Sequence, residues 1–287
     1  LEVKDCTAGE SAYLRIGFLK VEDFVLSNLR LPQNAELNIG DCCFKKFKLT
    51  NFRNIGKFKL YKINIFNKKI GERFQIDNTS IGKADFESID LTSFEKVVMF
   101  DNIFTNIDYS NVQWEKKIEV GQFGKSNKVE TAKKRDTYRT LKNIALRNND
   151  QPQALIFYKR EMDNHWEITT WKKEFSNKLT LTFNKCTNNF GLNWWLPIFE
   201  LLVIGLLLYC ITLSSLDLNG CELQKYEAIT NKIGKYFIFL NPLHKIEFMA
   251  KGCWSNLSYF LDAFFRVIGS LLIYQTIYAF RKYSRKL

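Results

Sequence analysis

Apolar and polar residues alternate in short runs through the first part of the chain, from about residue 11 to residue 114. Phe58–Ile65 and Phe74–Asp77 are two such runs, and Asn, Gly and Lys residues separate them from their neighbours. A period of two residues is typical of β-strands that bury one face. We therefore predict a β-rich domain over residues 1–126.

A finer repeat of five residues appears within this region. Ala84–Ser88 is followed by Ile89–Ser93, and Asn106–Ile107 stands five residues before Asn111–Val112. The pattern resembles degenerate pentapeptide repeats, in which small or apolar residues point inward every five residues and the coils stack as a right-handed β-helix. The pattern covers residues 84–114, and an ordinary β-sandwich or twisted sheet is the alternative.

From about Val129 the apolar spacing becomes that of a helix. Asp150 before Pro152 is a helix-start signal, because proline is tolerated at the first helical positions. We expect a helical hairpin and then an interfacial helix over about residues 175–190, so that residues 127–190 form a linker. The apolar faces of the hairpin are predicted at Tyr138, Leu141, Ala145 and Leu146 and at Ala154, Phe157, Glu161 and Met162.

Two long apolar segments, Trp194–Leu216 and Leu257–Phe280, lie near the C-terminus. A bilayer core about 30 Å thick requires roughly 20 apolar helical residues, and both segments have that length. We predict a transmembrane region over residues 191–287, with spans at about 194–216 and 257–280 and a 40-residue connection between them. The predicted fold class is an α+β membrane protein with a cytoplasmic, β-helix-like N-terminal domain, a helical hairpin linker and a two-helix transmembrane region.

Basic residues flank both spans on the side that a hairpin would share. They are Lys172, Lys173, Lys178 and Lys185 before the first span, and Arg281, Lys282, Arg285 and Lys286 after the second. The positive-inside rule then places the N-terminal domain and the C-terminus in the cytoplasm.

The connection would lie on the other side of the membrane. Its segment Tyr236–His244 is too apolar for a plain loop, so we expect it to lie in the interface, to dip into the membrane or to pack on a neighbouring subunit. Cys221 and Cys253 also lie in the connection, where they can form a disulfide or remain unpaired.

Three ionisable residues fall inside the apolar segments: Glu200, Asp262 and Arg266. Asp262 and Arg266 are four residues apart on one helical face and can pair, whereas Glu200 lies about two turns into the first span and does not reach Arg266. Two spans are too few to shelter these charges, so we predict a homo-oligomer, such as a tetramer, around a polar path. An ion pair inside one subunit, with Glu200 reaching the interface, is the alternative.

The net charge of +12 comes from 42 basic and 30 acidic residues, which favours anionic partners such as lipid headgroups, nucleotides or nucleic acid. Between Asp41 and Glu72 the chain has many cations and no acid. Cations interleaved with Phe and Tyr can bind phosphates and stack on bases. The alternative is a solvated face or one that supports assembly. The candidate anion-binding residues are Lys45, Lys46, Lys48, Arg53, Lys57, Lys59, Lys62, Lys68 and Lys69.

The chemistry of catalysis is missing from the sequence. It contains no Gly-rich phosphate loop, no Ser/His/Asp set and no cluster with metal-ligand spacing, and it has only two histidines. We therefore expect a protein that is not an enzyme, with no cofactor and no metal site.

The order of the short sequence motifs along the chain resembles that of a bacterial family of pentapeptide-repeat membrane proteins, which are described as ion-channel-like. The similarity covers roughly the C-terminal half and has no catalytic residues to transfer. It is carried by Tyr138-x-x-Leu141-Lys142, Asn149-Asp150-x-x-x-Ala154-Leu155-x-Phe157, Glu161-Met162, Asn189-Phe190-Gly191-Leu192-Asn193-Trp194, Leu240-Asn241-Pro242-Leu243-His244 and Ile273-Tyr274-Gln275-Thr276-x-x-Ala279-Phe280-Arg281-Lys282-Tyr283.

The resemblance implies an oligomeric ion channel in the bacterial inner membrane. By analogy with two-span channel effectors of antiphage defence, an anionic ligand such as a nucleotide or oligonucleotide would gate it through the cytoplasmic domain. The alternative is a membrane-anchored interaction scaffold that conducts nothing.

Overall fold

The computed structural model describes residues 1–65, 71–114, 118–119, 128–216, 229–245, 248 and 254–284. The chain folds into two compact units, Leu1–Lys173 and Glu174–Leu287. Residues 127–190, which the sequence groups into one linker, are therefore divided between the two units.

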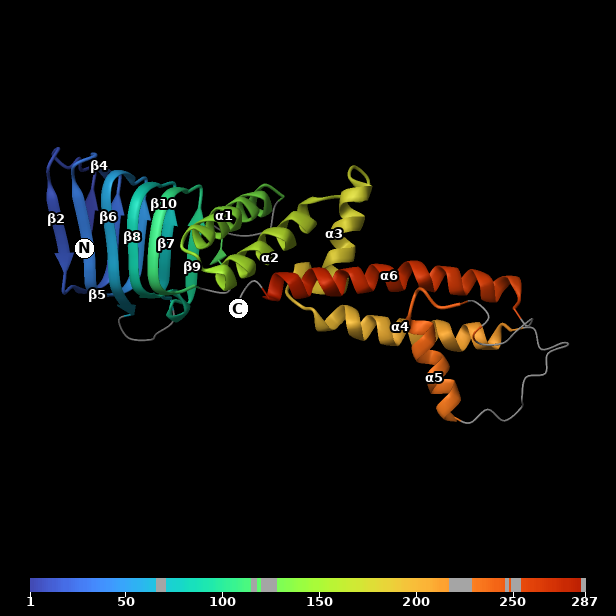
Figure 1. Cartoon of the computed structure of the whole chain (residues 1–287). Helices are drawn as coiled ribbons and strands as arrows, with labels where there is room; N and C mark the ends of the chain where they lie inside the picture. The colour runs from blue at the N-terminus through green and yellow to red at the C-terminus, as the bar shows by residue number, and fades with distance from the viewer. Residues whose placement is uncertain are drawn as a thin grey trace. The chain divides into compact units, whose positions relative to one another are not determined.

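The first unit begins with a series of β-strands (Figure 1). The alternating pattern is confirmed, because these strands cover most of residues 13–113. The strands are β1 (Glu2–Lys4), β2 (Tyr13–Gly17), β3 (Lys20–Ser27), β4 (Arg30–Leu31), β5 (Glu36–Thr50), β6 (Arg53–Ile65), β7 (Arg73–Asp77), β8 (Ser80–Asp90), β9 (Lys96–Phe100), β10 (Ile103–Gln113) and β11 (Ile118–Glu119).

All strand pairings are parallel, and they form two stacks that meet in β5. The first half of β5 pairs with β2 and β6, and its second half pairs with β3 and β7. From β6 one stack continues to β8 and β10, and from β7 the other continues to β9 and β11. This is a β-solenoid, as the β-helix prediction required, and the β-sandwich alternative is wrong.

Each coil of the solenoid turns at residues in the left-handed region. One corner is formed by Asp5, Asn28, Asn51, Asn78 and Asp101, all with φ between 51° and 56°. Asp and Asn tolerate this conformation better than other side chains. Neighbouring members are 23 residues apart, except Asn51 and Asn78, which are 27 residues apart. The structural repeat is thus a coil of 23 residues, whereas the sequence shows only a five-residue spacing.

Aromatic side chains fill the interior of the solenoid. Phe24 stacks on Phe47 of the next coil with ring centroids 5.8 Å apart, Phe47 stacks on Phe74 at 5.0 Å, and Phe44 stacks on Phe24 from the side at 4.7 Å. All four side chains are buried. Because equivalent positions of successive coils lie above one another, these rings form a continuous column that holds the coils together.

Helices α1 (Lys128–Arg147) and α2 (Gln151–Ile168) pack against each other, and α1 contacts the last coils. Asn148 donates to the Ile107 carbonyl and accepts from the Tyr109 N–H, both at 2.9 Å. The hairpin therefore satisfies part of the open edge of β10, which would otherwise be available for pairing with another chain.

The predicted start of α2 is confirmed, because the Asp150 carboxylate accepts from the Gln153 N–H at 3.1 Å. Asp150 also accepts from the Tyr109 hydroxyl at 2.8 Å. Burial, and then this hydrogen bond, raises the pKa of Tyr109. The placement of Leu146 on the buried face is wrong: its side chain is exposed, and Ile144 lies in the core instead, because it follows Leu141 by three residues.

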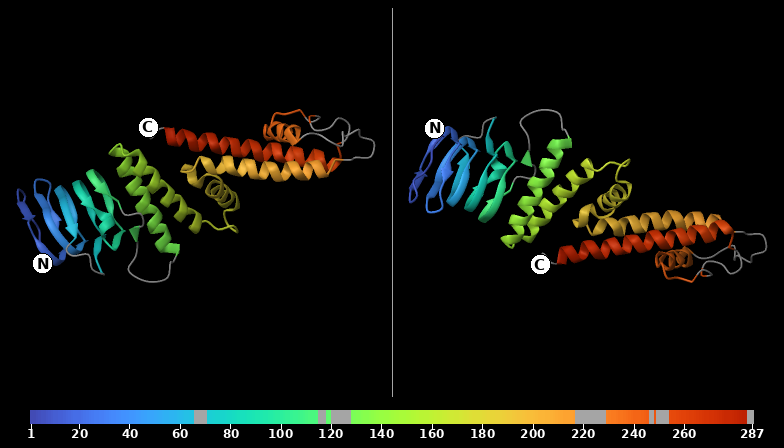
Figure 2. Two further views of the ribbon diagram at one scale, coloured as in Figure 1. Left: turned by 90° about the horizontal axis from the view of Figure 1, so that it is seen from below. Right: turned by 90° about the horizontal axis from the view of Figure 1, so that it is seen from above.

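The second unit contains α3 (Phe175–Asn188), α4 (Trp195–Ser214), α5 (Ile229–Leu240) and α6 (Asn256–Ser284). Helices α4 and α6 run antiparallel and side by side (Figures 1 and 2). Trp194 contacts Phe280 at one end, and the Ser255 hydroxyl donates to the Ser215 carbonyl at the other. Trp195–Ser214 and Asn256–Lys282 are long and apolar enough to cross a membrane, as predicted.

An amide cluster joins α3 to α6. Asn188, which is fully buried, donates to the Gln275 side-chain oxygen and accepts from the Gly191 N–H at 2.9 Å. The Gln275 amide in turn donates to Asn184 at 3.0 Å. Because buried amides are costly when unpaired, this cluster fixes the end of α3 against α6.

Helix α5 packs on the two long helices of its own chain. Tyr236 donates to the Leu202 carbonyl at 2.7 Å, and the Phe239 ring stacks on Phe265 at 4.3 Å. The apolar segment Tyr236–His244 thus has a partner within its own chain, an arrangement that the sequence did not predict. Cys221 and Cys253 lie outside the described residues.

Candidate functional site

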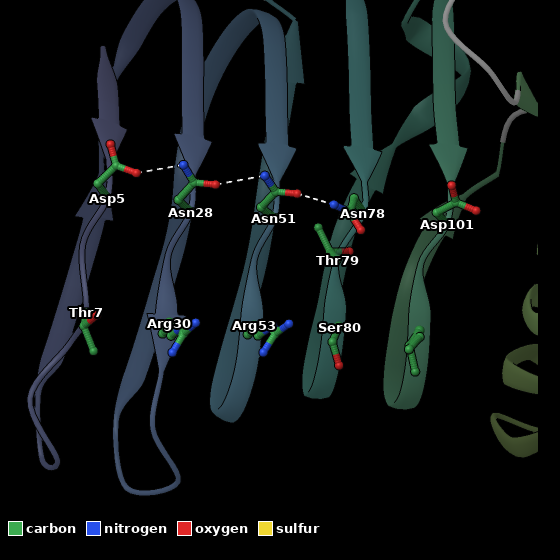
Figure 3. A pocket seen from close by; sticks show the side chains of 11 residues that line it. Asp5, Thr7, Asn28, Arg30, Asn51, Arg53, Asn78, Thr79, Ser80 and Asp101 are labelled. Carbon is green, nitrogen blue, oxygen red and sulfur yellow. Dashed lines mark hydrogen bonds between the residues drawn. The ribbon is translucent and has the colours of Figure 1, made fainter.

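The first candidate site is a groove of about 550 Å³ along one corner of the solenoid (Figure 3). Two rows of side chains bound the groove, and successive coils contribute successive residues to each row. One row is the corner itself, and the other comes two residues later in each coil. The groove is lined by Asp5, Thr7, Asn28, Arg30, Asn51, Arg53, Asn78, Thr79, Ser80, Asp101 and Ile103.

Hydrogen bonds connect the corner residues into an asparagine ladder. Asn28 donates to Asp5 at 2.7 Å, Asn51 donates to Asn28 at 2.9 Å, and Asn78 donates to Asn51. Beyond the ladder, Asp101 accepts from Lys133 at 2.6 Å. Both acids of the groove are therefore engaged by their neighbours, and the ladder presents a row of amides.

The second row contains two arginines that are neighbours in register. Arg30 pairs with Arg53 across β4 and β6, and Arg53 pairs with Ser80 across β6 and β8. Their backbones are therefore about 4.8 Å apart. Both arginines are exposed, and the ion pairs of the described residues include neither of them. Two like charges in direct register are destabilising unless an anion lies between them.

The predicted anion-binding residues do not form one surface. Lys45, Lys46 and Lys48 lie in the half of β5 that pairs with β3 and β7, whereas Arg53, Lys57 and Lys59 lie in β6, in the other stack. Lys62 stands at the second corner, with φ of 48°. Lys68 and Lys69 lie outside the described residues. Only Arg53 lines the groove, because each corner of the coil turns a continuous run of cations onto another face.

Several of these lysines are paired with acids from neighbouring coils. Lys46 lies 3.4 Å from Asp23, Lys62 lies 3.6 Å from Asp41, and Lys59 lies 2.9 Å from Glu87. The hydrogen bond from Lys59 lowers the pKa of Glu87 and raises that of Lys59. These lysines are less available to an external anion than the arginine pair.

Arg30 is not among the anion-binding residues predicted from the sequence, because it lies outside the acid-free stretch between Asp41 and Glu72. The signal that identifies it is the separation of 23 residues from Arg53, which is the length of one coil and matches the separation of Asn28 from Asn51. Without knowledge of the coil length, that separation has no meaning.

The second candidate site is a buried cluster in the second unit. The predicted pair is confirmed, because the Arg266 Nε donates to Asp262 Oδ2 at 2.8 Å within α6. The sequence missed the third member, His244, whose Nε2 lies 2.7 Å from Asp262 Oδ1. Both the His244 and the Asp262 side chains are at least 97% buried, with 1% and 3% exposure.

The backbone completes this cluster. His244 Nδ1 lies 2.7 Å from the Asn241 carbonyl oxygen, and Arg266 Nη2 donates to the His244 carbonyl at 2.8 Å. The turn that follows α5 is thereby held to α6 from both sides. No pattern in the sequence indicates this contact, because 18 residues separate His244 from Asp262.

Glu200 stands apart from the cluster. Within the described residues no ion pair includes Glu200, and its side chain is partly exposed. Val203 and Leu207, three and seven residues later on the same helical face, are exposed as well. Glu200 is therefore only partly covered by its own chain.

A metal site is a separate question. Over the part of the chain that the structure describes, no three His, Cys, Asp or Glu side chains are placed to hold an ion. The expectation that the protein needs no metal or cofactor remains a prediction.

Comparison of the chain with protein-family models, with curated proteins and with solved structures finds no match. The solenoid and the two apolar helices are features of this structure itself.

Proposed function

We propose that the protein is an oligomeric ion channel in which α4 and α6 cross the membrane and the solenoid binds an anionic ligand that gates the pore. Glu200 is the observation that carries this proposal. An acid without a partner, on a helix of this length and hydropathy, is costly in a bilayer unless it faces water or a second subunit. In a ring of Glu200 side chains around a polar path, each carboxylate faces both water and the neighbouring subunits.

The surface of the second unit supports membrane insertion. The exposed faces of α4 and α6 are almost entirely apolar, which is the reverse of the pattern of a soluble helical hairpin. These faces include Phe199, Leu202, Val203, Leu206, Leu207 and Ile211 on α4, and Phe260, Phe264, Val267, Leu271, Tyr274, Ile277 and Phe280 on α6.

The arginine pair supports an anionic ligand on the solenoid. Arg guanidinium groups bind phosphate oxygens through two parallel hydrogen bonds, and two of them in register can hold one phosphate between them. The amides of the asparagine ladder, in the adjacent row, can accept and donate hydrogen bonds to the rest of a nucleotide.

The biological setting belongs to the same proposal. The motif resemblance supports a bacterial inner-membrane protein of the pentapeptide-repeat, ion-channel-like family, with the solenoid and the C-terminus in the cytoplasm. It supports a role as a membrane-disrupting effector of antiphage defence that responds to a nucleotide or oligonucleotide. In this role the protein has no catalytic activity.

A non-conducting membrane-anchored scaffold is the second candidate, and the buried cluster favours it. Asp262 is neutralised by Arg266 and His244 within one chain, so this acid does not require a polar path. Of the three ionisable residues in the apolar segments, only Glu200 therefore supports an oligomeric pore.

Ion flux into liposomes tests the proposal. The full chain is reconstituted, and potassium flux is measured with no addition and with ATP, a single-stranded hexanucleotide or inorganic phosphate. We expect flux above that of empty liposomes and a severalfold change with a phosphorylated compound. Absence of flux under every condition would contradict the proposal that the protein is a channel. If flux is present but no phosphorylated compound changes it, the proposal that an anionic ligand gates the channel is contradicted.

The arginine pair predicts which variant loses the ligand response. Arg30→Ala combined with Arg53→Ala should abolish the change in flux, because the phosphate loses both guanidinium partners. The control combines Arg73→Ala with Lys96→Ala, which removes two cations in adjacent register from the other stack. Equal loss of response in the two double variants would show that general positive charge, and not the groove, attracts the ligand.

A further inference from the structure

His244 occupies a site that a neutral imidazole cannot satisfy when the neighbouring Asp262 is ionised. Its two ring nitrogens lie 2.7 Å from the Asn241 carbonyl oxygen and 2.7 Å from Asp262 Oδ1. A carbonyl oxygen and an ionised carboxylate are both acceptors, whereas a neutral imidazole has one N–H and one lone pair. If both groups were deprotonated, the ring nitrogen without a hydrogen would present its lone pair to an oxygen 2.7 Å away: Nε2 to Asp262 Oδ1 in one tautomer, or Nδ1 to the Asn241 carbonyl in the other.

Two arrangements remove this conflict, and both contain one additional proton. In the first, His244 is an imidazolium that donates to both oxygens. In the second, His244 is neutral with its hydrogen on Nδ1, and Asp262 Oδ1 carries the proton and donates it to Nε2. Arg266 donates to Asp262 Oδ2 at 2.8 Å, which stabilises the carboxylate and favours the imidazolium form.

We infer that His244 and Asp262 form a proton-binding site, and that the bound proton fastens the turn after α5 to α6. This site is independent of the ligand groove and of whether the protein conducts ions. The proton is held between two side chains that are almost completely buried, so its loss cannot be compensated by solvent without movement of the turn.

Among the residues that the structure describes, few other charges surround the site. From α6 it is faced by Asp262 and Arg266, and Arg266 also donates to the His244 carbonyl. From α5 the Phe239 ring lies 5.6 Å away, and Phe248 lies 4.6 Å away. From α4, the titratable Tyr209 belongs to the same core: its ring packs on Phe239, and its hydroxyl donates to the Lys232 carbonyl. Lys245 beside His244 is exposed.

The direction of the pH effect follows from the proton count. The fastened form binds one more proton than a form in which the turn has separated and both groups are deprotonated. Raising the pH therefore favours separation, and the opening equilibrium changes about tenfold per pH unit over the range in which the fastened site holds its proton and the separated side chains do not. Helix α5 should then lose protection, because its C-terminal end is anchored by this turn.

The experiment uses the full chain in lipid bilayers, labelled with ¹⁵N-histidine. The sequence has only two histidines, so His165→Gln leaves His244 as the single signal. Hydrogen exchange of residues 229–245 is measured on the same samples between pH 6 and pH 10. We expect a protonated pair at neutral pH, and a loss of protection of about tenfold per pH unit beyond intrinsic exchange as the pH rises toward the range in which the imidazole signal changes.

The Asp262→Asn variant distinguishes the effect of the bound proton from the effect of side-chain packing. The amide retains the size of the side chain but cannot hold the shared proton as a carboxylate does, so His244 should be neutral and the exchange of α5 should lose its pH dependence. The inference is overturned if His244 in the parent protein is neutral beside an ionised Asp262 at neutral pH. It is equally overturned if the protection of α5 does not change while the His244 signal titrates.

Discussion

Gly56→Ala is expected to destabilise the solenoid severely. A Cβ atom at this position would lie 2.2 Å from the Ala35 carbonyl oxygen and 2.4 Å from the Pro32 carbonyl oxygen. Both contacts are with backbone, which cannot rotate away, and the chain there belongs to the preceding coil. The cost should reach or exceed about 3 kcal/mol, the upper part of the range for overpacking. Urea denaturation followed by circular dichroism measures it.

Gly9→Ala is the matched control for this prediction. No atom lies within 4 Å of a Cβ placed at Gly9. The change should therefore alter stability by less than about 0.5 kcal/mol. If the two alanine variants unfold at the same urea concentration, the close approach of successive coils at residue 56 is not present in solution.

Asp262→Ala is expected to release α5 from α6. It removes the acceptor of both His244 Nε2 and Arg266 Nε at a site where the acid is 2% exposed. Removal of one partner from a buried ion pair costs about 3–5 kcal/mol. The loss is measured as the shift of the unfolding midpoint in a detergent titration with sodium dodecyl sulfate.

Glu200→Ala is the control, because Glu200 has no ion-pair partner among the described residues and its own removal should not destabilise a single chain. Equal stability of the two variants would show that the buried cluster does not hold α5. Together the two substitutions separate the acid that maintains the fold from the acid that we assign to conduction.

The sequence predicts the local structure of this protein well, because local structure follows from short periods. Alternation at Phe58–Ile65 identifies β6, and Asp150 with Pro152 identifies the start of α2. The coil could not be predicted in the same way. Its register depends on irregularities such as the shift between Asn54 and Lys57, which interrupt the alternation.

The candidate sites show the same limit. The Asp262–Arg266 pair is predictable because residues four apart share a helical face. His244 is not, because its place depends on how α5 folds back on α4 and α6. The run of cations from Lys45 to Lys69 looked continuous in one dimension, and the solenoid corners divide it between faces.

Glu200 is proposed to line an ion path, and this role is tested by the reversal potential under a potassium chloride gradient. The full chain and its Glu200→Lys variant are compared in planar bilayers. A ring of carboxylates favours cations and a ring of lysines favours anions, so the variant should shift the reversal potential toward the chloride equilibrium value. Absence of current from the parent protein, or currents with the same reversal potential in both proteins, would contradict this role of Glu200.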